Sequence, residues 1–164
     1  MPPWRRKTIV LRELVAEDAP SLARLHALAF HRGWGEDEFE RLITSSSSLG
    51  DGAAFSERGR LQGFVLSRMA GREAEILSIV VDPSSRRQGM ARALLSSHLD
   101  RLRGLSVSEL FLEVDEDNGG ALAFYETFGL RTVGRRRGYY PRASGGHGGA
   151  LILRCDLDTR GSVR

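Results

Sequence analysis

A basic stretch that leads through a glycine into a helical pattern is the clearest chemical signal in the chain. Residues 80–92 read Val-Val-Asp-Pro-Ser-Ser-Arg-Arg-Gln-Gly-Met-Ala-Arg. A helix that begins at Gly89 would present unpaired backbone N–H groups and a partial positive charge, which together bind anions. Three arginines add positive charge to this segment: Arg86, Arg87 and Arg92. The pattern predicts a pyrophosphate site, although an ordinary helix start with a solvated basic turn fits the same residues.

A carboxylate inside an apolar strand pattern is the second signal. In residues 110–114, Leu-Phe-Leu-Glu-Val, the side chains of Phe111 and Glu113 point to one face of the strand. An ionised glutamate that is buried without a partner is costly, and a carboxyl in a cleft can serve as a general base. Glu113 is therefore a candidate base, and the alternative is a glutamate that faces water.

Asn118 and Tyr125 lie seven positions apart, about two turns of a helix, and so share one helix face. A tyrosine hydroxyl can donate a proton to a leaving group. The same residues also fit simpler roles, because asparagine is a common N-cap and a tyrosine can pack in a core with its hydroxyl at the edge.

The elements that must position these residues are hairpins followed by an alternation of strands and helices. The patterns predict strands over residues 8–11, 53–57, 61–69, 74–81, 109–115, 131–140 and 150–157. They predict helices over 22–29, 36–43, 89–103 and 118–128, with Pro20 in the first turn of the first helix and a loop over 45–48. This order favours a mixed α+β fold in one domain over residues 1–158, with a flexible tail over 159–164.

Composition sets the class of protein. A hydrophobic share of 41% and a charged share of 27% over 164 residues are those of an ordinary globular domain. Neither a membrane-spanning run nor a secretory signal is evident, so we expect a cytoplasmic protein. Cys155 is the sole cysteine and reads as a buried hydrophobe. The four histidines lack metal-ligand spacing, no metal is expected, and His26 and His98 read as solvated helix residues.

Two motifs together resemble one family. Residues 86–91 are similar to the Gln/Arg-x-x-Gly-x-Gly/Ala signature of the GNAT acetyltransferase superfamily. Residues 112–130 resemble its pattern Leu-Glu-Val, Asn-x-x-Ala, Tyr-x-x-x-Gly-Phe. Ala29-Phe30 with Trp34 and Phe39, and Arg-Arg-Gly-Tyr-Tyr-Pro over 136–141, are similar to the RimI-type protein N-terminal acetyltransferases. The likeness covers nearly the whole chain and is more specific than either motif alone.

This resemblance implies a GNAT fold, with a mixed, mostly antiparallel sheet of about seven strands and flanking helices. It implies acetyl-CoA as the acetyl donor, held by Ile79, Val80, Val81, Arg86, Arg87, Gln88, Gly89, Met90, Ala91, Arg92, Asn118 and Tyr125. Glu113 would accept the proton of the attacking amine, directly or through water, and Tyr125 would protonate the leaving thiolate. A backbone N–H near the end of strand 79–81 would hold the thioester oxygen. The transfer needs no covalent enzyme intermediate.

The same resemblance implies the acceptor. In this group it is a protein N-terminus, namely the N-terminal alanine of a small-subunit ribosomal protein, and Trp34, Tyr139 and Tyr140 are candidate walls of its groove. Two loops depart from the enterobacterial pattern: His-Arg-Gly at 31–33 lengthens the first, and residues 144–149 lack acidic side chains. Both loops would border the peptide groove.

Three alternatives stay open at this stage. One is an acetyltransferase of the same fold that modifies a small amine such as a polyamine or an antibiotic. Another is a basic ribosome- or RNA-surface binding protein, for which the candidate patch is Arg131, Arg135, Arg136 and Arg137. The third is a CoA-binding module without turnover. The favoured reading requires no nucleic acid and no membrane as a partner.

Overall fold

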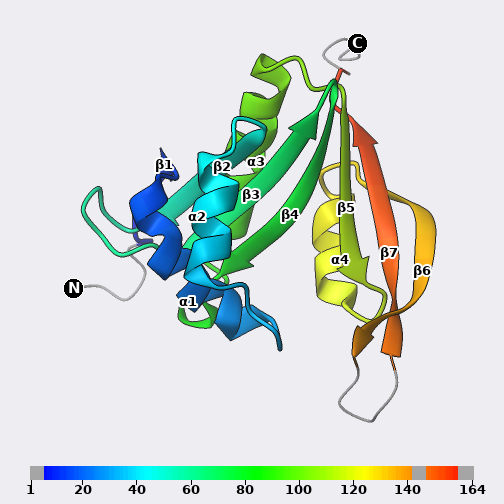
Figure 1. The fold of residues 1–164 in the computed structure, drawn as a ribbon, viewed down its shortest axis with the longest axis horizontal. Coiled ribbons are helices and arrows are strands. Elements are labelled where there is room, and N and C mark those ends of the chain that lie inside the picture. Colours follow the sequence, from blue (N-terminus) through cyan, green and yellow to red (C-terminus); the bar gives the residue numbers. More distant parts are fainter. Residues whose placement is uncertain (1–5, 142–146, 159–164) are drawn as a thin grey trace.

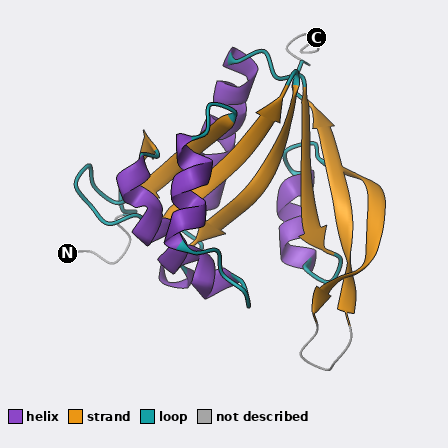
Figure 2. Cartoon of the chain, in the orientation of Figure 1, coloured by secondary structure: helices purple, strands orange, loops and turns teal. Residues whose placement is uncertain are grey.

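A single seven-stranded sheet forms the centre of the molecule (Figures 1 and 2). The computed structural model describes residues 6–141 and 147–158, and of residues 139–141 and 147 only the backbone. Within these residues the strands are β1 (Val10–Glu13), β2 (Ser48–Ala54), β3 (Gly63–Ala70), β4 (Glu73–Val81), β5 (Glu109–Asp115), β6 (Arg131–Pro141) and β7 (His147–Asp156). The helices are α1 (Ala19–Ala29), α2 (Glu36–Thr44), α3 (Met90–Gly104) and α4 (Gly119–Glu126), with short 3-10 turns η1 (Ala16–Asp18) and η2 (Pro83–Ser85).

The strand order is β1-β2-β3-β4-β5-β7-β6, and only the β4–β5 pair is parallel. The predicted mixed, mostly antiparallel sheet with flanking helices is confirmed. Helices α1 and α2 lie over one face of β2–β4, whereas α3 and α4 lie on the other face (Figure 1). The sheet therefore separates two hydrophobic layers.

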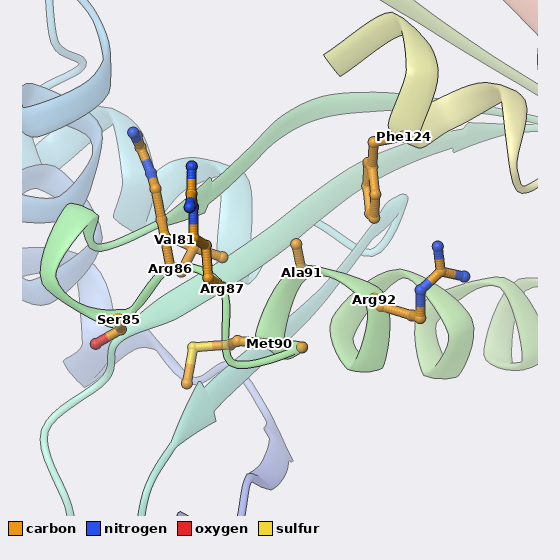
Figure 3. A pocket seen from close by; sticks show the side chains of 9 residues that line it. Val81, Ser85, Arg86, Arg87, Met90, Ala91, Arg92 and Phe124 are labelled. Atoms are coloured by element: carbon orange, nitrogen blue, oxygen red, sulfur yellow. The ribbon is translucent and has the colours of Figure 1, made fainter. Parts of the chain in front are cut away.

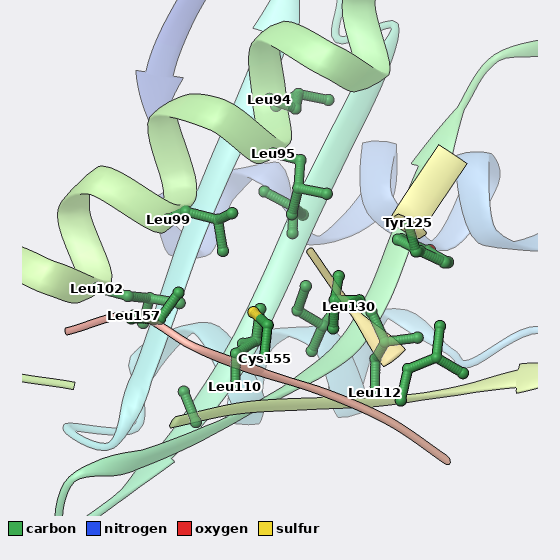
Figure 4. Close-up of a cluster of buried hydrophobic side chains, with 14 of the residues drawn as sticks. Leu94, Leu95, Leu99, Leu102, Leu110, Leu112, Tyr125, Leu130, Cys155 and Leu157 are labelled. Carbon is green, nitrogen blue, oxygen red and sulfur yellow. The ribbon is translucent and has the colours of Figure 1, made fainter. Parts of the chain in front are cut away.

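These layers are two distinct cores. The α3-side core joins leucines of α3, such as Leu94 and Leu99, to Leu110 and Leu112 of β5 and to Tyr125 of α4 (Figure 4). The α1-side core joins α1 and α2 to β3 and β4; its buried members are Leu14, Ala19, Leu22, Leu25, Phe39, Leu61, Phe64, Leu66 and Val80. Buried apolar side chains at helical spacing hold the helices on each face.

A β-bulge in β4 shifts the register against β3. Leu66 pairs with Ser78 and Ser67 pairs with Ile76, so Leu77 has no partner on β3. Because side chains alternate between faces, one inserted residue exchanges the faces beyond it. Ile76 accordingly lies in the α3-side core and Val80 in the α1-side core, although they are four residues apart.

Beyond the bulge β4 leaves its parallel neighbour. β4 and β5 pair only from Glu73–Glu109 to Ile76–Leu112, whereas β5 continues to pair with β7 as far as Asp115. Figure 1 shows the two strands diverging toward the end of the molecule where α1 and α4 lie. The last residues of β4, from Leu77 to Val81, consequently have no ladder partner on the β5 side in the described part of the chain.

The direction of the unpaired amides follows from one hydrogen bond. The Asp82 N–H donates to the carbonyl oxygen of Gln62, on the β3 side of the strand, at 2.7 Å. Successive amides of a strand point to opposite sides. The amide groups of Val81 and Ile79 therefore point away from β3, toward the separation between β4 and β5.

Strand β2 begins earlier than its sequence indicates. Ser48, Gly50 and Gly52 are typical of a loop, and the sequence pattern placed the strand from residue 53. The structure has a strand from Ser48 because these residues pair with β3 and, from Asp51, with β1. The glycines admit Leu14 and Leu61 above them: a Cβ at Gly50 would lie 2.8 Å from Leu14, and one at Gly52 2.8 Å from Leu61. Tertiary packing thus overrides local propensity here.

The reading of His26 and His98 as solvated helix residues is wrong. Their side chains are buried, with 3% and 0% of their surface exposed. His98 Nε2 lies 2.6 Å from Ser67 Oγ, and its Nδ1 lies 2.7 Å from a carboxylate oxygen of Asp51. Arg101 pairs with the same carboxylate. This polar network ties α3 to β2 and β3 from inside, and a helix pattern does not reveal it because its partners are distant in sequence.

Cys155 is buried, as predicted, and burial raises the pKa of its thiol to about 11. Within residues 6–141 and 147–158, no helix is long and apolar enough to cross a membrane.

Candidate functional site

The turn between β4 and α3 is held firmly at its start. The Asp82 carboxylate accepts hydrogen bonds from the Ser84 N–H at 2.9 Å and the Ser84 hydroxyl at 2.7 Å, which lower the pKa of Asp82. Ser85 donates to Gln62 at 2.9 Å, and Arg24 of α1 lies 3.4 Å from Asp82. Pro83 fits the first position of η2. These hydrogen bonds fix residues 82–85, and the basic loop begins directly after them.

Two residues of this loop have left-handed backbones. Gly89, the N-cap of α3, has φ +81°, and Arg87 has φ +61°. A glycine adopts this region freely, but for arginine it costs on the order of 1 kcal/mol. Such strain at a non-glycine residue is typical of functional loops. Gly89 also precedes the right-handed residues of α3, and a left-handed residue beside a right-handed one turns neighbouring N–H groups to one side, where they can bind an anion.

A pocket lies at the N-terminus of α3 (Figure 3). It is lined by Val81, Ser85, Arg86, Arg87, Gly89, Met90, Ala91, Arg92 and Phe124. Six of these residues are among those predicted to hold acetyl-CoA between positions 86 and 92. Gln88 of the same segment is exposed and is not part of the lining. The structure thus brings most of the predicted phosphate loop to one pocket.

Arg92 differs from the other two arginines of the pocket in that its side chain contacts residues of α4 and the turn after it. Its guanidinium lies over the rings of Phe128, at 5.1 Å from the centroid, and Phe124, at 6.0 Å, and it donates to Thr127 at 3.1 Å. These contacts join α3 to α4 on the far side of the pocket. Arg92 is thus engaged with α4 in this structure, whereas Arg86 and Arg87 are exposed at the loop.

Phe124 is a pocket residue that sequence reasoning did not single out. Its ring faces Ala91 and Arg92 across the pocket (Figure 3). Together with Val81 and Met90 it provides an apolar wall beside the cationic loop. The only signal was its place next to Tyr125, since an aromatic on a short helix does not by itself distinguish a pocket wall from core. The pocket suits a ligand with a diphosphate joined to a less polar arm.

The two upstream strand residues lie apart from the pocket lining. Val80 is buried in the α1-side core, and Ile79 packs against the α3-side core. Only their backbone, at the separation between β4 and β5, is available to a ligand there. Val81 both lines the pocket and turns its amide toward that separation.

Glu113 lies on β5 opposite its apolar neighbours. Leu112 and Val114 point into the α3-side core, so Glu113 faces the other side of the sheet, with 18% of its side chain exposed. The Arg136 guanidinium lies 3.0 Å from its carboxylate. The carboxylate predicted within the apolar run of residues 110–114 is therefore half-buried and ion-paired rather than freely solvated.

Asn118 and Tyr125 occupy the two ends of α4. Asn118 Oδ1 accepts a hydrogen bond from the Ala121 N–H at 3.1 Å, so the side chain is an N-cap, the simpler of its two readings. Tyr125 is 8% exposed and lies in the α3-side core, with its ring 5.4 Å from that of Phe124. Tyr125 thus stands next to the pocket residue Phe124, on the same helix.

The predicted acceptor residues divide into two groups. Trp34 is half-buried in the segment between α1 and α2 and stacks on His26. Tyr139 and Tyr140 belong to β6, but their side chains lie outside what the structure describes. Residues 144–146 of the second loop also lie outside the described residues.

Known proteins resemble this chain over most of its length. A model of the acetyltransferase (GNAT) family matches residues 19–130. A protein of Escherichia coli (strain K12) named [ribosomal protein bS18]-alanine N-acetyltransferase is 31% identical over 82% of this chain and 89% of its own length. The N-alpha-acetyltransferase RimI of Mycobacterium tuberculosis (strain H37Rv) is 36% identical over 84% of this chain and 87% of its own. The crystal structure of the Escherichia coli ribosomal-protein-S18-alanine N-acetyltransferase superposes with a TM-score of 0.85 at 29% identity, covering 96% of this chain and 99% of that one.

Proposed function

Since the chain belongs to the acetyltransferase (GNAT) family, we propose that it transfers the acetyl group of acetyl-CoA to the N-terminal amine of a protein. The acceptor is the N-terminal alanine of a small-subunit ribosomal protein, the substrate that the name of the Escherichia coli relative gives for that enzyme. A cytoplasmic location accompanies this acceptor, because ribosomal proteins are made and assembled there.

One structural relationship carries the proposal. The pocket at the start of α3 lies on the α3 side of the sheet, whereas Glu113 faces the α1 side. Beyond Ile76 and Leu112 the strands β4 and β5 are no longer paired, and the proposal places the meeting of donor and acceptor between them. A donor bound on one side and an amine bound on the other can therefore meet in line, which supplies much of the acceleration of a two-substrate reaction.

The donor site fits the chemistry of acetyl-CoA. The backbone N–H groups from Arg87 to Met90, at the start of the 15-residue helix α3, suit its pyrophosphate. Arg86 and Arg87 add a cationic field, and Phe124 and Val81 offer an apolar surface to the pantetheine arm. These contacts bind the donor before and during the reaction, so they set its affinity more than its turnover.

The acceptor arrives as an ammonium ion, which cannot attack a carbonyl. Glu113 takes the proton of this ammonium, directly or through water. The amine nitrogen then attacks the thioester carbon, and a bond forms between them. Negative charge develops on the thioester oxygen, and an amide of Ile79 or Val81, turned into the separation, donates to it.

The tetrahedral intermediate collapses when the carbon–sulfur bond breaks. The sulfur leaves as a thiolate, and Tyr125 gives it a proton from a hydroxyl whose ordinary pKa is about 10. As the amide forms, its nitrogen loses a second proton to solvent. Glu113 then releases the proton that it took, and Tyr125 recovers one from solvent, so the transfer releases one proton in all. No covalent bond to the protein forms, which agrees with the burial of Cys155.

Mass spectrometry of a mixed reaction tests this function. The purified protein is incubated with acetyl-CoA, a peptide with a free N-terminal alanine and an internal lysine, and spermidine. The proposal expects a single acetyl group on the α-amine of the peptide. Modification of the lysine or of spermidine alone would assign the chain to small or side-chain amines instead.

A further inference from the structure

The segment between α1 and α2, residues 30–35, folds back tightly on α1. At Gly33 a Cβ would lie 3.2 Å from the Cα of Ala27, so only glycine allows this approach without displacing backbone. Figure 1 shows the segment at the end of the molecule toward which β4 and β5 diverge. A wall at this place would border an acceptor on the Glu113 side of the sheet.

The segment is built around the imidazole of His26. This ring is stacked between Phe30, at 4.3 Å between centroids, and Trp34, at 4.7 Å, with interplanar angles of 24° and 16°. Phe39 of α2 meets it edge-on at 5.5 Å. Aromatic pairs at these separations stabilise the fold by more than their buried area alone would. Phe30 is 39% exposed, so one side of the stack faces solvent while His26 itself is buried.

A hydrogen bond fixes the same segment. The backbone N–H of Trp34 donates to His26 Nδ1 at 3.0 Å. A ring nitrogen that accepts carries no proton, so the imidazole is neutral with its proton on Nε2. Burial lowers the pKa of His26 to about 4, which keeps this acceptor available throughout the physiological range.

The cluster connects to the strand beside the separation. Phe39 lies 5.7 Å from Phe64 of β3 in an edge-to-face arrangement, and Phe64 pairs in register with Val80 of β4. Contacts thus run from the stack through Phe39 of α2 and Phe64 of β3 to β4. β4 is the strand whose Ile79 and Val81 amides point to the proposed reaction site. These rings thus connect the segment to β3, the neighbour of β4.

We infer that His26 is a positioning residue for the acceptor: through one hydrogen bond and two ring stacks it shapes residues 30–35 into the wall on which the first residues of the acceptor peptide lie. The inference rests on the proposed function. It assigns His26 no contact with the reacting atoms. If this is so, changing His26 should alter the KM for the acceptor peptide. The KM for acetyl-CoA should not change, because the donor pocket lies on the other face of the sheet.

Three substitutions separate the two kinds of contact. His26→Asn keeps an acceptor near the place of Nδ1 but loses the ring, His26→Phe keeps the ring but loses the acceptor, and His26→Ala loses both. Leu22→Ala is the matched control, because Leu22 is fully buried one turn earlier on the same helix, in the same α1-side core, and offers neither a hydrogen-bond acceptor nor a ring. For each variant, KM for an alanine peptide, KM for acetyl-CoA, kcat and Tm are measured.

The expected result is an increase of about tenfold in the peptide KM for His26→Ala, since small misplacements of a binding wall weaken binding by such factors. The KM for acetyl-CoA stays within about twofold. His26→Asn and His26→Phe fall between the wild type and His26→Ala. Leu22→Ala lowers Tm and leaves both KM values unchanged.

Two results would overturn the inference, and they have different meanings. If His26→Ala, or the milder variants where His26→Ala does not fold, behaves like Leu22→Ala, His26 has only a structural role and the proposed function stands. If the wild type transfers acetyl to spermidine but to no peptide, the proposed function fails and the inference fails with it.

Discussion

The guanidinium of Arg136 lies 3.0 Å from the carboxylate of Glu113, although strand β7 lies between the two strands that carry them. Glu113 pairs in register with Ile152 of β7, and Ile152 pairs with Gly134 of β6, so the ion pair crosses β7 diagonally. A long cationic side chain thus already occupies the carboxylate to which a cationic N-terminus would bind. Under the proposed function, an acceptor that gives its proton to Glu113 would share this carboxylate with Arg136.

Replacing Glu113 by glutamine removes the proposed base while keeping the shape of the side chain. We expect kcat to fall by about 10²- to 10⁴-fold, the usual contribution of a general base. Acetyl-CoA affinity, measured by calorimetry, stays within about twofold because the donor pocket lies on the other face. Glu109→Gln is the control, since Glu109 lies on the same strand and pairs with Arg154. Equal activity of the two variants would refute the role of Glu113.

Tyr125→Phe removes a single hydroxyl from the α3-side core. We expect turnover to fall by about 10²-fold or more, because the leaving thiolate loses its proton donor. The ring and its packing against Phe124 remain, so acetyl-CoA binding is retained. Steady-state kinetics with calorimetry check both quantities. A variant with wild-type kcat would remove Tyr125 from the mechanism.

Gly89→Ala tests the left-handed cap of α3. The space around Gly89 is open, so the added methyl group acts only through φ +81°, at a cost of about 1–2 kcal/mol. Because the loop relaxes to relieve this strain, we expect the Kd for coenzyme A to rise about tenfold.

Gly71→Ala provides the control for that experiment. Gly71 has φ +59° and open space in the β3–β4 turn, away from the pocket. An alanine at this position is strained in the same way, so the free energy of unfolding of the Gly71→Ala variant should fall by a similar amount. Its affinity for coenzyme A should stay unchanged. A similar loss of affinity in both variants would show that strain alone, and not the loop, determines binding.

The pH dependence of stability should report the burial of His26. Its pKa is about 4 in the folded protein and 6.5 in an ordinary setting. As the pH falls from 6.5 toward 4, the unfolded state takes up a proton that the folded state does not, so the free energy of unfolding decreases. The full effect is about 3 kcal/mol. Urea unfolding at pH 7.5 and 5 should show a smaller decrease for His26→Phe than for the wild type; equal decreases would contradict this assignment.

The buried network around His98 should be costly to disrupt. Asp51→Asn leaves Arg101 and His98 without their shared carboxylate, and we expect a loss of about 3–5 kcal/mol in urea unfolding. Glu75→Gln, which breaks the exposed pair with Arg68, should change stability by less than about 1 kcal/mol. A small effect of Asp51→Asn would mean that water replaces the lost partner.

The sequence predicted the elements that depend on local patterns. Strand β5 has the predicted bounds because its alternation is uninterrupted, and Gly89 and Gly129 mark the start of α3 and the end of the α4 region. The phosphate loop could be predicted because all its parts are contiguous. The start of β2, the burial of His26 and His98, and the pocket role of Phe124 could not, since each depends on residues brought together from distant elements.

The bulge at Leu77 is another feature that could not be predicted from the sequence. No residue type marks it, yet it moves Ile76 and Val80 to different cores and sends β4 away from β5. A helix or strand pattern cannot reveal such a shift, because the register of a strand is decided by its partner. The separation between the strands, on which the proposed chemistry depends, is therefore a tertiary property.

The most direct test of the account is calorimetry with a bisubstrate analogue, in which coenzyme A is joined through an acetyl carbon to the N-terminal nitrogen of an alanine peptide. If donor and acceptor meet in the separation between β4 and β5, the analogue should bind at least about 10²-fold more tightly than coenzyme A, because both sites are filled by one molecule. An affinity equal to that of coenzyme A alone would contradict the account.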